Sequence, residues 1–198
     1  MFHNFNKKVN EYRLKKKQKN FEKFHSQLDL PFLETDNEFI KEIFQTLEFE
    51  FGLKSNSKQK LIDLGVGNGT IVIFSALNHN IKSYGIEINQ KLINEAKIRI
   101  KSLKKEGNYK KKLFKKIKIK QGDFYLLNLK FYDFIYIYSL PTMQRYLKHV
   151  FNTAKKNAVI ISFKYQLKNF NSIFTLQKRL ILNKNKKEFS TFFYKKIS

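Results

Sequence analysis

The chain has 198 residues, enough for one domain with a sizeable core. It contains no cysteine, which excludes disulfides and thiolate metal sites and favours a reducing, cytoplasmic location. Forty Lys and Arg residues against sixteen Asp and Glu give a formal net charge of +24. Such a charge favours nucleic acid or another acidic surface as a partner, although the codon usage of an AT-rich genome would produce the same composition. Both interpretations stay open.

Two further classes of protein are excluded. No run of 18 apolar residues exists, so we expect no transmembrane segment. The four histidines are scattered without metal-ligand spacing, and we expect each of them at the surface or in a loop: His3, His25, His79 and His149.

Residues 1–30 are expected to form a basic amphipathic helical arm. Apolar residues recur at spacings of three and four from Phe2 to Tyr12 and again from Phe21 to Leu28, with lysines between them. Such an arm either covers the domain that follows or binds a membrane surface or nucleic acid.

A second domain, residues 31–198, is expected to begin where Pro31 interrupts the helical pattern. Thr35 followed by Glu38 has the spacing of a capping box and predicts a helix over residues 36–48.

The rest of this domain is organised around the stretch from Lys60 to Asn89. A short apolar strand stops at three alternating glycines, a helix follows, and a second strand ends at Glu87. Glycine permits positive φ and lets the backbone approach a ligand, and the first amides of the helix point at it. An acid at the carboxyl end of the second strand can accept both hydroxyls of a ribose, so the stretch predicts a site for a nucleoside-type cofactor.

Two common nucleotide motifs are excluded. The dinucleotide fingerprint wants glycine or alanine where Thr70 stands, and the phosphate loop of nucleotide hydrolases wants a Gly-Lys-Ser/Thr sequence that is missing. The residues present read Asp63-x-Gly65-x-Gly67-x-Gly69.

The remaining segments complete an alternating pattern of strands and helices. We expect helices over about 90–103 and 142–155, and strands over 116–120, 131–138, 158–163, 172–182 and 188–194. The predicted fold is therefore α/β, with a Rossmann-like, seven-stranded, mostly parallel sheet, helices on both faces and a C-terminal antiparallel hairpin. Asp123, beside Gly122 at a strand end, either accepts from an adenine amino group or caps a turn.

These motifs resemble those of the seven-strand (class I) S-adenosylmethionine-dependent methyltransferases. In particular, the chain is similar to the small archaeal protein-lysine methyltransferases and their mitochondrial relatives that act on ATP-synthase and carrier lysines. The resemblance covers about Pro31 to Phe163, and Glu34 departs from it because the family often has proline there. The residues that carry it are Pro31–Thr35, Asp63–Gly69, Gly85–Asn89, Gly122-Asp123 and Tyr138–Thr142.

The resemblance implies S-adenosylmethionine as the cofactor and a protein substrate that bears a target lysine. It implies a cofactor site formed by Asp63, Gly65, Gly67, Gly69, Glu87 and Asp123. It places Thr35, Ser139 and Pro141 around the methionine end and the acceptor channel, with no general base and no metal. Tyr136, Tyr138 and Phe32 are candidate walls of that channel, or core residues.

Two alternatives remain at this stage. The net charge favours a nucleic-acid methyltransferase acting on RNA or DNA, but Ser139-Leu140-Pro141-Thr142 lacks the Asn/Asp-Pro-Pro-aromatic sequence that usually grips a flipped adenine. A non-catalytic basic binding module is the other, and the intact glycine motif argues against it.

Overall fold

The computed structural model describes residues 35–197, and the structural statements below concern that part of the chain. The expected arm, residues 1–30, lies outside the described residues, as do Pro31, Phe32 and Glu34. Within residues 35–197, no helix is both long and apolar enough to cross a bilayer.

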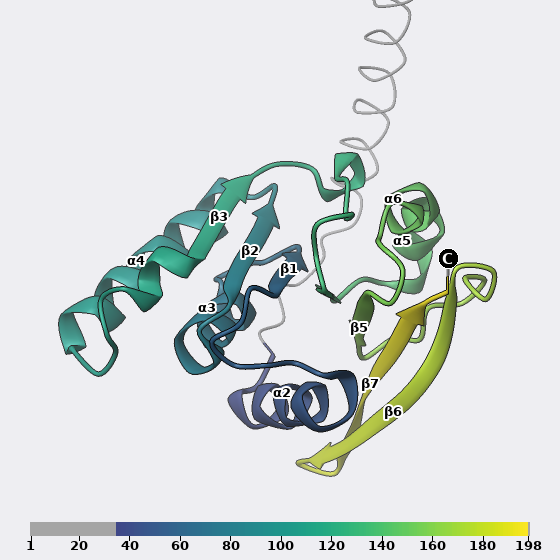
Figure 1. Ribbon diagram of the computed structural model, residues 1–198, viewed down its shortest axis with the longest axis horizontal. Coiled ribbons are helices and arrows are strands. Elements are labelled where there is room, and N and C mark those ends of the chain that lie inside the picture. The colour runs from purple at the N-terminus through teal and green to yellow at the C-terminus, as the bar shows by residue number, and fades with distance from the viewer. Residues whose placement is uncertain (1–34, 198) are drawn as a thin grey trace, which may run out of the picture. The chain divides into compact units, whose positions relative to one another are not determined.

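A seven-stranded sheet runs through the described chain in the order β3-β2-β1-β4-β5-β7-β6 (Figure 1). Its strands are β1 (Lys60–Leu64), β2 (Lys82–Glu87), β3 (Ile117–Gln121), β4 (Phe134–Ile137), β5 (Val159–Phe163), β6 (Phe174–Lys184) and β7 (Lys187–Lys196). The first five in sequence are parallel, whereas β7 is antiparallel to β5 and to β6. The predicted Rossmann-like fold with a C-terminal hairpin is therefore confirmed. Because the strand order reverses at β1, a ligand crevice is expected at the carboxyl ends of β1, β2 and β4.

Three long helices cover one face of this sheet. They are α2 (Asn37–Phe51), α3 (Thr70–His79) and α4 (Gln90–Glu106). The apolar side of α2, with Ile40, Ile43 and Phe44, shares one buried cluster with Phe134 of β4 and Ile161 of β5. This cluster holds the start of α2 over the middle of the sheet.

Short helices lie on the other face, over the second half of the sheet. They are α5 (Pro141–Gln144), η3 (Arg145–Leu147) and α6 (Lys148–Asn152), where one continuous helix over 142–155 was expected. Gln144 turns its side chain inward, and its amide donates to the carbonyl of Ser139 at 3.4 Å. The chain then tightens into the η3 turn, which interrupts the helix. Two further turns, η1 (Leu113–Lys116) and η2 (Phe124–Leu126), flank β3.

Two local expectations were wrong. The N-cap of α2 is Asp36, whose carboxylate accepts from the amide of Glu38 at 2.9 Å, so Thr35 is not the cap. His79 is neither at the surface nor in a loop, since it ends α3 as a buried residue. Its ring stacks on Phe44 and its Nδ1 lies 2.9 Å from Glu48 Oε1.

Candidate functional site

The glycine-rich turn after β1 folds back onto the end of β2. The amides of Gly65 and Val66 both donate to the carbonyl of Ile86, each at 2.9 Å. Gly65 and Gly69 have φ of +88° and +86°, values that side chains other than glycine rarely adopt. The alternating glycines therefore serve the turn itself, and α3 begins immediately after it with its first amides at the same edge of the sheet.

A fourth glycine makes this close approach possible. A Cβ on Gly85, the Cα partner of Asp63 in β2, would lie 2.5 Å from the nearest Val66 side-chain atom. The turn therefore packs directly on the backbone of β2.

Glu87 is buried at the end of β2, and backbone amides already occupy most of its carboxylate. Oε1 accepts from the amides of Ile88 and Asn89, each at 2.9 Å, and Oε2 accepts from the amide of Gly67 at 3.0 Å. An ionised carboxylate has about four acceptor positions, so one remains for a ribose hydroxyl rather than the two that were expected. Glu87 thus also fixes the conformation of the glycine turn.

Asp63 lies beneath this turn and is 3% exposed. Burial, and secondarily the charge of Glu87, raises the pKa of the Asp63 carboxyl well above its usual value. Its Cα partner in β4 is Tyr136, whose phenol pKa is also raised by burial. Both side chains therefore favour their neutral forms when no cation is close.

Asp123 follows β3 and does what a turn-capping residue does. Its Oδ1 accepts from the amide of Tyr125 at 2.8 Å and so caps η2. The preceding amide, that of Gly122, donates to the carbonyl of Glu87 at 2.9 Å. Asp123 therefore lies at the same edge of the sheet as Glu87.

The three residues expected around the acceptor occupy different positions. The hydroxyl of Thr35 lies 2.9 Å from the phenol oxygen of Tyr136, which ties the residue before α2 to β4. Ser139, two residues after β4, is 4% exposed, and its Oγ has no hydrogen-bond partner within residues 35–197. Pro141 is the exposed first residue of α5. Thr35 and Ser139 are thus both buried near the carboxyl end of β4, and Pro141 opens to solvent.

Sequence reasoning missed Tyr165, which belongs to the same edge. Its ring is parallel to that of Tyr138 within 6°, with centroids 6.1 Å apart, and the Tyr138 ring meets Phe163 edge-on at 5.8 Å. Lys164, which lies between Phe163 and Tyr165 in sequence, has a positive φ of 67°. Its Nζ lies 5.6 Å from the centroid of the Tyr165 ring. The sequence contained one signal for this residue, its position. Tyr165 comes shortly after the end of β5, just as Tyr138 comes shortly after the end of β4.

The described residues contain no group of three or more His, Cys, Asp or Glu side chains that could hold a metal ion. This edge of the sheet presents backbone amides, the buried carboxyls of Asp63 and Glu87, the buried hydroxyls of Thr35 and Ser139, and a set of aromatic rings.

A family model described as "ANTKMT methyltransferase domain" matches residues 63–173, more than half of the chain. No curated protein sequence matches the chain significantly.

Many solved structures share the fold. An RNA methyltransferase from Salinibacter ruber, in complex with S-adenosyl-L-homocysteine, superposes with a TM-score of 0.64 at 21% identity, over 83% of this chain and 94% of that one. Magnesium protoporphyrin IX methyltransferase from Synechocystis PCC 6803, with bound S-adenosylmethionine, gives 0.61 at 15% identity, over 87% and 90%. The B. subtilis m1A22 tRNA methyltransferase TrmK gives 0.56 at 17% identity, over 77% and 64%.

Proposed function

The chain belongs to the ANTKMT methyltransferase domain family, and on that premise we propose that it transfers the methyl group of S-adenosylmethionine to the ε-amine of a lysine in a protein. The methyltransferase activity follows from the family, and the class I fold agrees with neighbours crystallised with S-adenosylmethionine or its product. The lysine acceptor, the roles of the site residues and a cytoplasmic location of the protein are our proposal.

The residues present fit the cofactor. The glycine turn places backbone groups at the carboxyl end of β1, where the cofactor would bind. Glu87 keeps one acceptor position for the ribose. Asp123 lies at the adenine end, while Asp63 lies below the turn, where a positively charged ligand would favour its ionised form. Once bound, the cofactor supplies an electrophilic methyl group on a sulfonium.

The unpartnered hydroxyl of Ser139 is the observation that carries the acceptor assignment. A buried hydroxyl left without a hydrogen bond costs free energy, and such exceptions call for a ligand that completes them. Ser139 follows Tyr138, whose ring is stacked on that of Tyr165. A primary amine on a long apolar stem matches this arrangement, because its nitrogen can meet the hydroxyl while its methylene groups pack on the rings.

A lysine must lose its proton before it can attack. With a pKa near 10.4, removing the proton at pH 7 costs about 4–5 kcal/mol. Aromatic, partly buried walls and a nearby sulfonium both disfavour the ammonium form, so they lower that cost without a general base. The nitrogen lone pair then forms the N–C bond as the C–S bond breaks toward sulfur, and the displaced proton leaves to solvent. Holding the two reactants in line supplies much of the acceleration.

The decisive experiment identifies the atom that receives the methyl group. The full chain is incubated with methyl-labelled S-adenosylmethionine and source-cell lysate, and the products are digested separately with protease and ribonuclease. We expect label that is protease-sensitive and that mass spectrometry places on a lysine ε-amine. Label on glutamine, arginine or a nucleotide would refute the lysine acceptor and leave the methyltransferase assignment intact.

A rate profile gives a second, independent test. Because only the neutral amine attacks, kcat for a saturating lysine peptide should rise with pH up to the shifted pKa of the bound amine. The exocyclic amine of adenine is neutral at pH 7 and would give a flat profile over the same range. A flat profile would therefore contradict the lysine assignment.

A further inference from the structure

One face of β2 and β3 carries no helix among the described elements. Helices α3 and α4 both pack on the opposite face, where Ile73 of α3, Ala96 of α4 and Ile119 of β3 surround Gly69. In Figure 1 the arrows of β2 and β3 lie in front of α4. The chain between β3 and β4 forms only the η2 turn, so no helix of residues 35–197 covers the near face of these strands.

Lysines occupy this open face in register across three strands. Lys60 of β1 and Lys82 of β2 are Cα partners, so their side chains point to the same face. Tyr84, two residues after Lys82, is paired with Lys118 of β3, and Lys120 follows on the same face. Like charges directly opposite each other in a sheet destabilise it, which makes this arrangement costly unless an anion lies over it.

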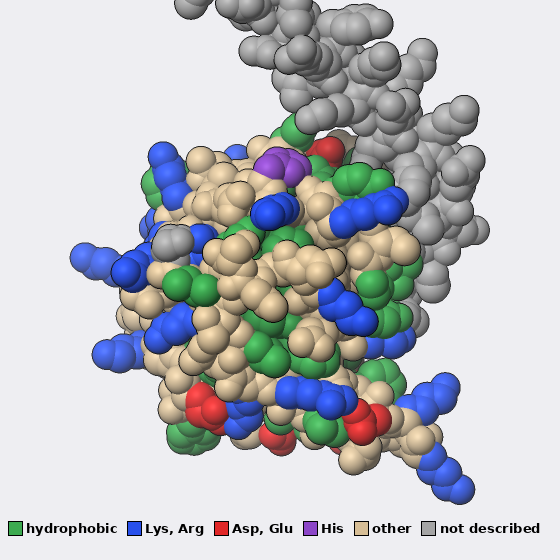
Figure 2. All heavy atoms as spheres, turned by 90° about the vertical axis from the view of Figure 1, so that its right-hand side faces the viewer, with side chains coloured by type: hydrophobic (Ala, Val, Ile, Leu, Met, Phe, Trp, Pro, Cys, Tyr) green, Lys and Arg blue, Asp and Glu red, His purple; other side chains and the backbone are tan. Residues whose placement is uncertain are grey.

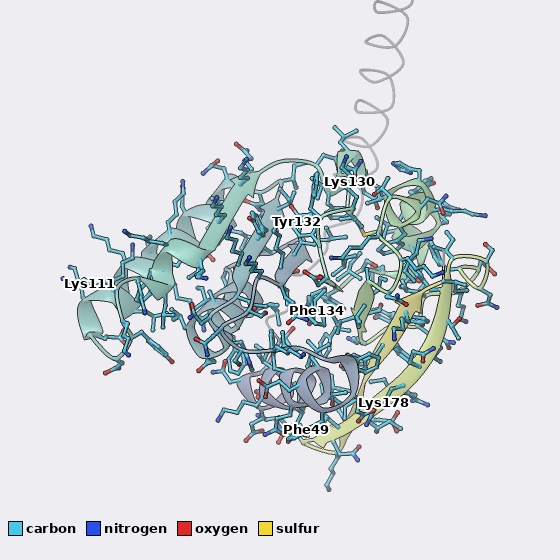
Figure 3. All side chains as sticks on the ribbon, viewed as in Figure 1. Phe49, Lys111, Lys130, Tyr132, Phe134 and Lys178 are labelled. Carbon is cyan, nitrogen blue, oxygen red and sulfur yellow. The ribbon has the colours of Figure 1, made fainter. Side chains whose placement is uncertain are left out.

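Aromatic rings lie between the lysines. Tyr84 meets Tyr132 edge-on at 5.4 Å, and Lys118 Nζ lies 5.8 Å from the Tyr84 centroid. Phe131 is 58% exposed, with Lys60 Nζ at 5.7 Å and Lys130 Nζ at 4.9 Å from its centroid. Lys130 and Tyr132 are labelled in Figure 3. We call this surface the lysine–aromatic face; it comprises Lys60, Tyr84, Lys82, Lys118, Lys120, Lys130, Phe131 and Tyr132.

The carboxylate nearest to these residues in the chain is already engaged. Asp133 Oδ2 accepts from the amide of Lys60 at 2.7 Å, and its Oδ1 pairs with Lys155 at 2.6 Å. The hairpin side differs, since there acidic and basic side chains are interspersed (Figure 2). Two of its cations are paired, Arg179 with Glu188 and Lys184 with Asp36. Within residues 35–197, by contrast, no lysine of the lysine–aromatic face is in an ion pair.

We propose that the lysine–aromatic face binds single-stranded nucleic acid, with phosphates on the lysines and a base on Phe131. Backbone phosphates are the anions that a row of lysines matches, and exposed rings beside such a row provide stacking platforms for unpaired bases. A duplex hides its bases and could use only the lysines. An acidic peptide could likewise pair with the lysines but gives the exposed ring no planar partner.

This binding is separate from the proposed methyl transfer. Lys120 is followed by Gln121, Gly122 and Asp123, so the face extends to the edge of the cofactor site, and a strand bound there would pass beside it. The inference does not depend on which acceptor is methylated.

The test measures fluorescence anisotropy of a labelled 12-nucleotide oligouridylate with the full chain, between 50 and 200 mM salt. The triple variant Lys60→Gln, Lys82→Gln, Lys118→Gln should bind at least about tenfold more weakly. Its plot of log affinity against log salt should lose a slope of about 2, since each phosphate contact contributes about 0.7 for single strands. Phe131→Ala should weaken binding by about tenfold with an unchanged slope, because stacking is not ionic.

Matched controls separate this site from general charge. Lys91→Gln, Lys97→Gln, Lys101→Gln removes the same charge from exposed positions of α4, and Phe49→Ala removes a ring that is 86% exposed. Both controls should bind nearly as the parent does. Equal losses in the controls, no binding of the oligonucleotide, or duplex binding that depends equally on Phe131 would each overturn the proposal. Poly-glutamate that competes as well as the oligonucleotide would overturn it too, in favour of an acidic protein partner.

Discussion

Thr35 and Tyr136 lie 101 residues apart in sequence, yet their hydroxyl oxygens are 2.9 Å apart in a buried hydrogen bond. This bond fixes the residue just before the N-cap of α2 against the carboxyl-terminal part of β4, below the edge where the acceptor is proposed to enter. Because each hydroxyl is the partner of the other, the loss of either one leaves a buried polar group without a hydrogen bond.

Tyr136→Phe should therefore lower the free energy of unfolding by about 1–3 kcal/mol, because the Thr35 hydroxyl stays buried without a partner. The double variant with Thr35→Val removes both polar groups and should recover most of this loss. Urea denaturation of the four proteins measures the coupling. If the two single losses simply add in the double variant, the hydrogen bond does not contribute to stability.

Ser139→Ala should lower kcat/KM about 2- to 13-fold, the value of one hydrogen bond of 0.5–1.5 kcal/mol, without lowering stability. Ser75→Ala is the matched control, because Ser75 is the other buried hydroxyl without a partner within residues 35–197. It lies in α3 and should not alter the rate. Unchanged kinetics in the Ser139 variant would remove this hydroxyl from the reaction.

Gly85→Ala should destabilise the protein by about 1–3 kcal/mol, since the added Cβ would overlap the Val66 side chain. For a chain of this size the melting temperature should fall by roughly 2–12 °C. Gly122→Ala offers the comparison, because its Cβ would meet Ile86 at an ordinary 3.7 Å. A similar melting temperature for the two variants would mean that the turn does not need the close approach.

Glu87→Ala should weaken binding of S-adenosylmethionine by about 1.5–3 kcal/mol, the value of a hydrogen bond to a charged acceptor. It should also destabilise the apo-protein, because three backbone amides lose their acceptor. Calorimetric titration measures the affinity, and Glu95→Ala on the exposed side of α4 is the control. Unchanged affinity would exclude Glu87 from the cofactor site.

Asp63→Asn should stabilise the cofactor-free protein increasingly as pH rises above about 4. The pKa of Asp63 is raised in the folded state, so above the unfolded value of 3.8 the folded protein binds more protons, and its stability falls with rising pH. Asparagine does not titrate and escapes this loss. Urea denaturation between pH 4 and 7 measures the growing difference.

Asp36 provides the opposite control. Hydrogen bonds from Lys184 and the Glu38 amide lower the pKa of Asp36, so its contribution is present above the unfolded value of 3.8 and lost as pH falls. Asp36→Asn should therefore cost stability at neutral pH and little at pH 3. Parallel pH profiles for the two variants would contradict the proposed states of both carboxyls.

The sequence allowed most of the fold to be predicted, because strand and helix periods and the glycine turn are local signals. The seven strands and their final hairpin were all anticipated, as was the gathering of Asp63, Glu87 and Asp123 at one edge. What it missed depends on distant partners. Thr35 and Asp36 are both residue types that can cap a helix. The Thr35 hydroxyl is bonded to Tyr136, and Asp36 is the N-cap.

Other details also needed the folded chain. The backbone bonds that occupy Glu87 arise only when the turn folds back onto β2. The break after α5 follows from the inward side chain of Gln144, and helical periodicity does not report that direction. Tyr165 became a candidate only when β5 was placed beside β4.

The attachment of α2 to the C-terminal hairpin sets the order in which the protein becomes complete. Asp36 and Glu38 bind Lys184 at 2.7 and 3.0 Å, and the rings of Phe39 and Phe189 lie 4.8 Å apart. Helix α2 leaves the ribosome early, whereas these partners are synthesised only after all five parallel strands. The part of the helix that faces the hairpin therefore stays uncovered until β6 and β7 have emerged. A nascent chain stalled before the hairpin would hold the glycine turn, while the start of α2 would still lack its contacts with Lys184 and Phe189.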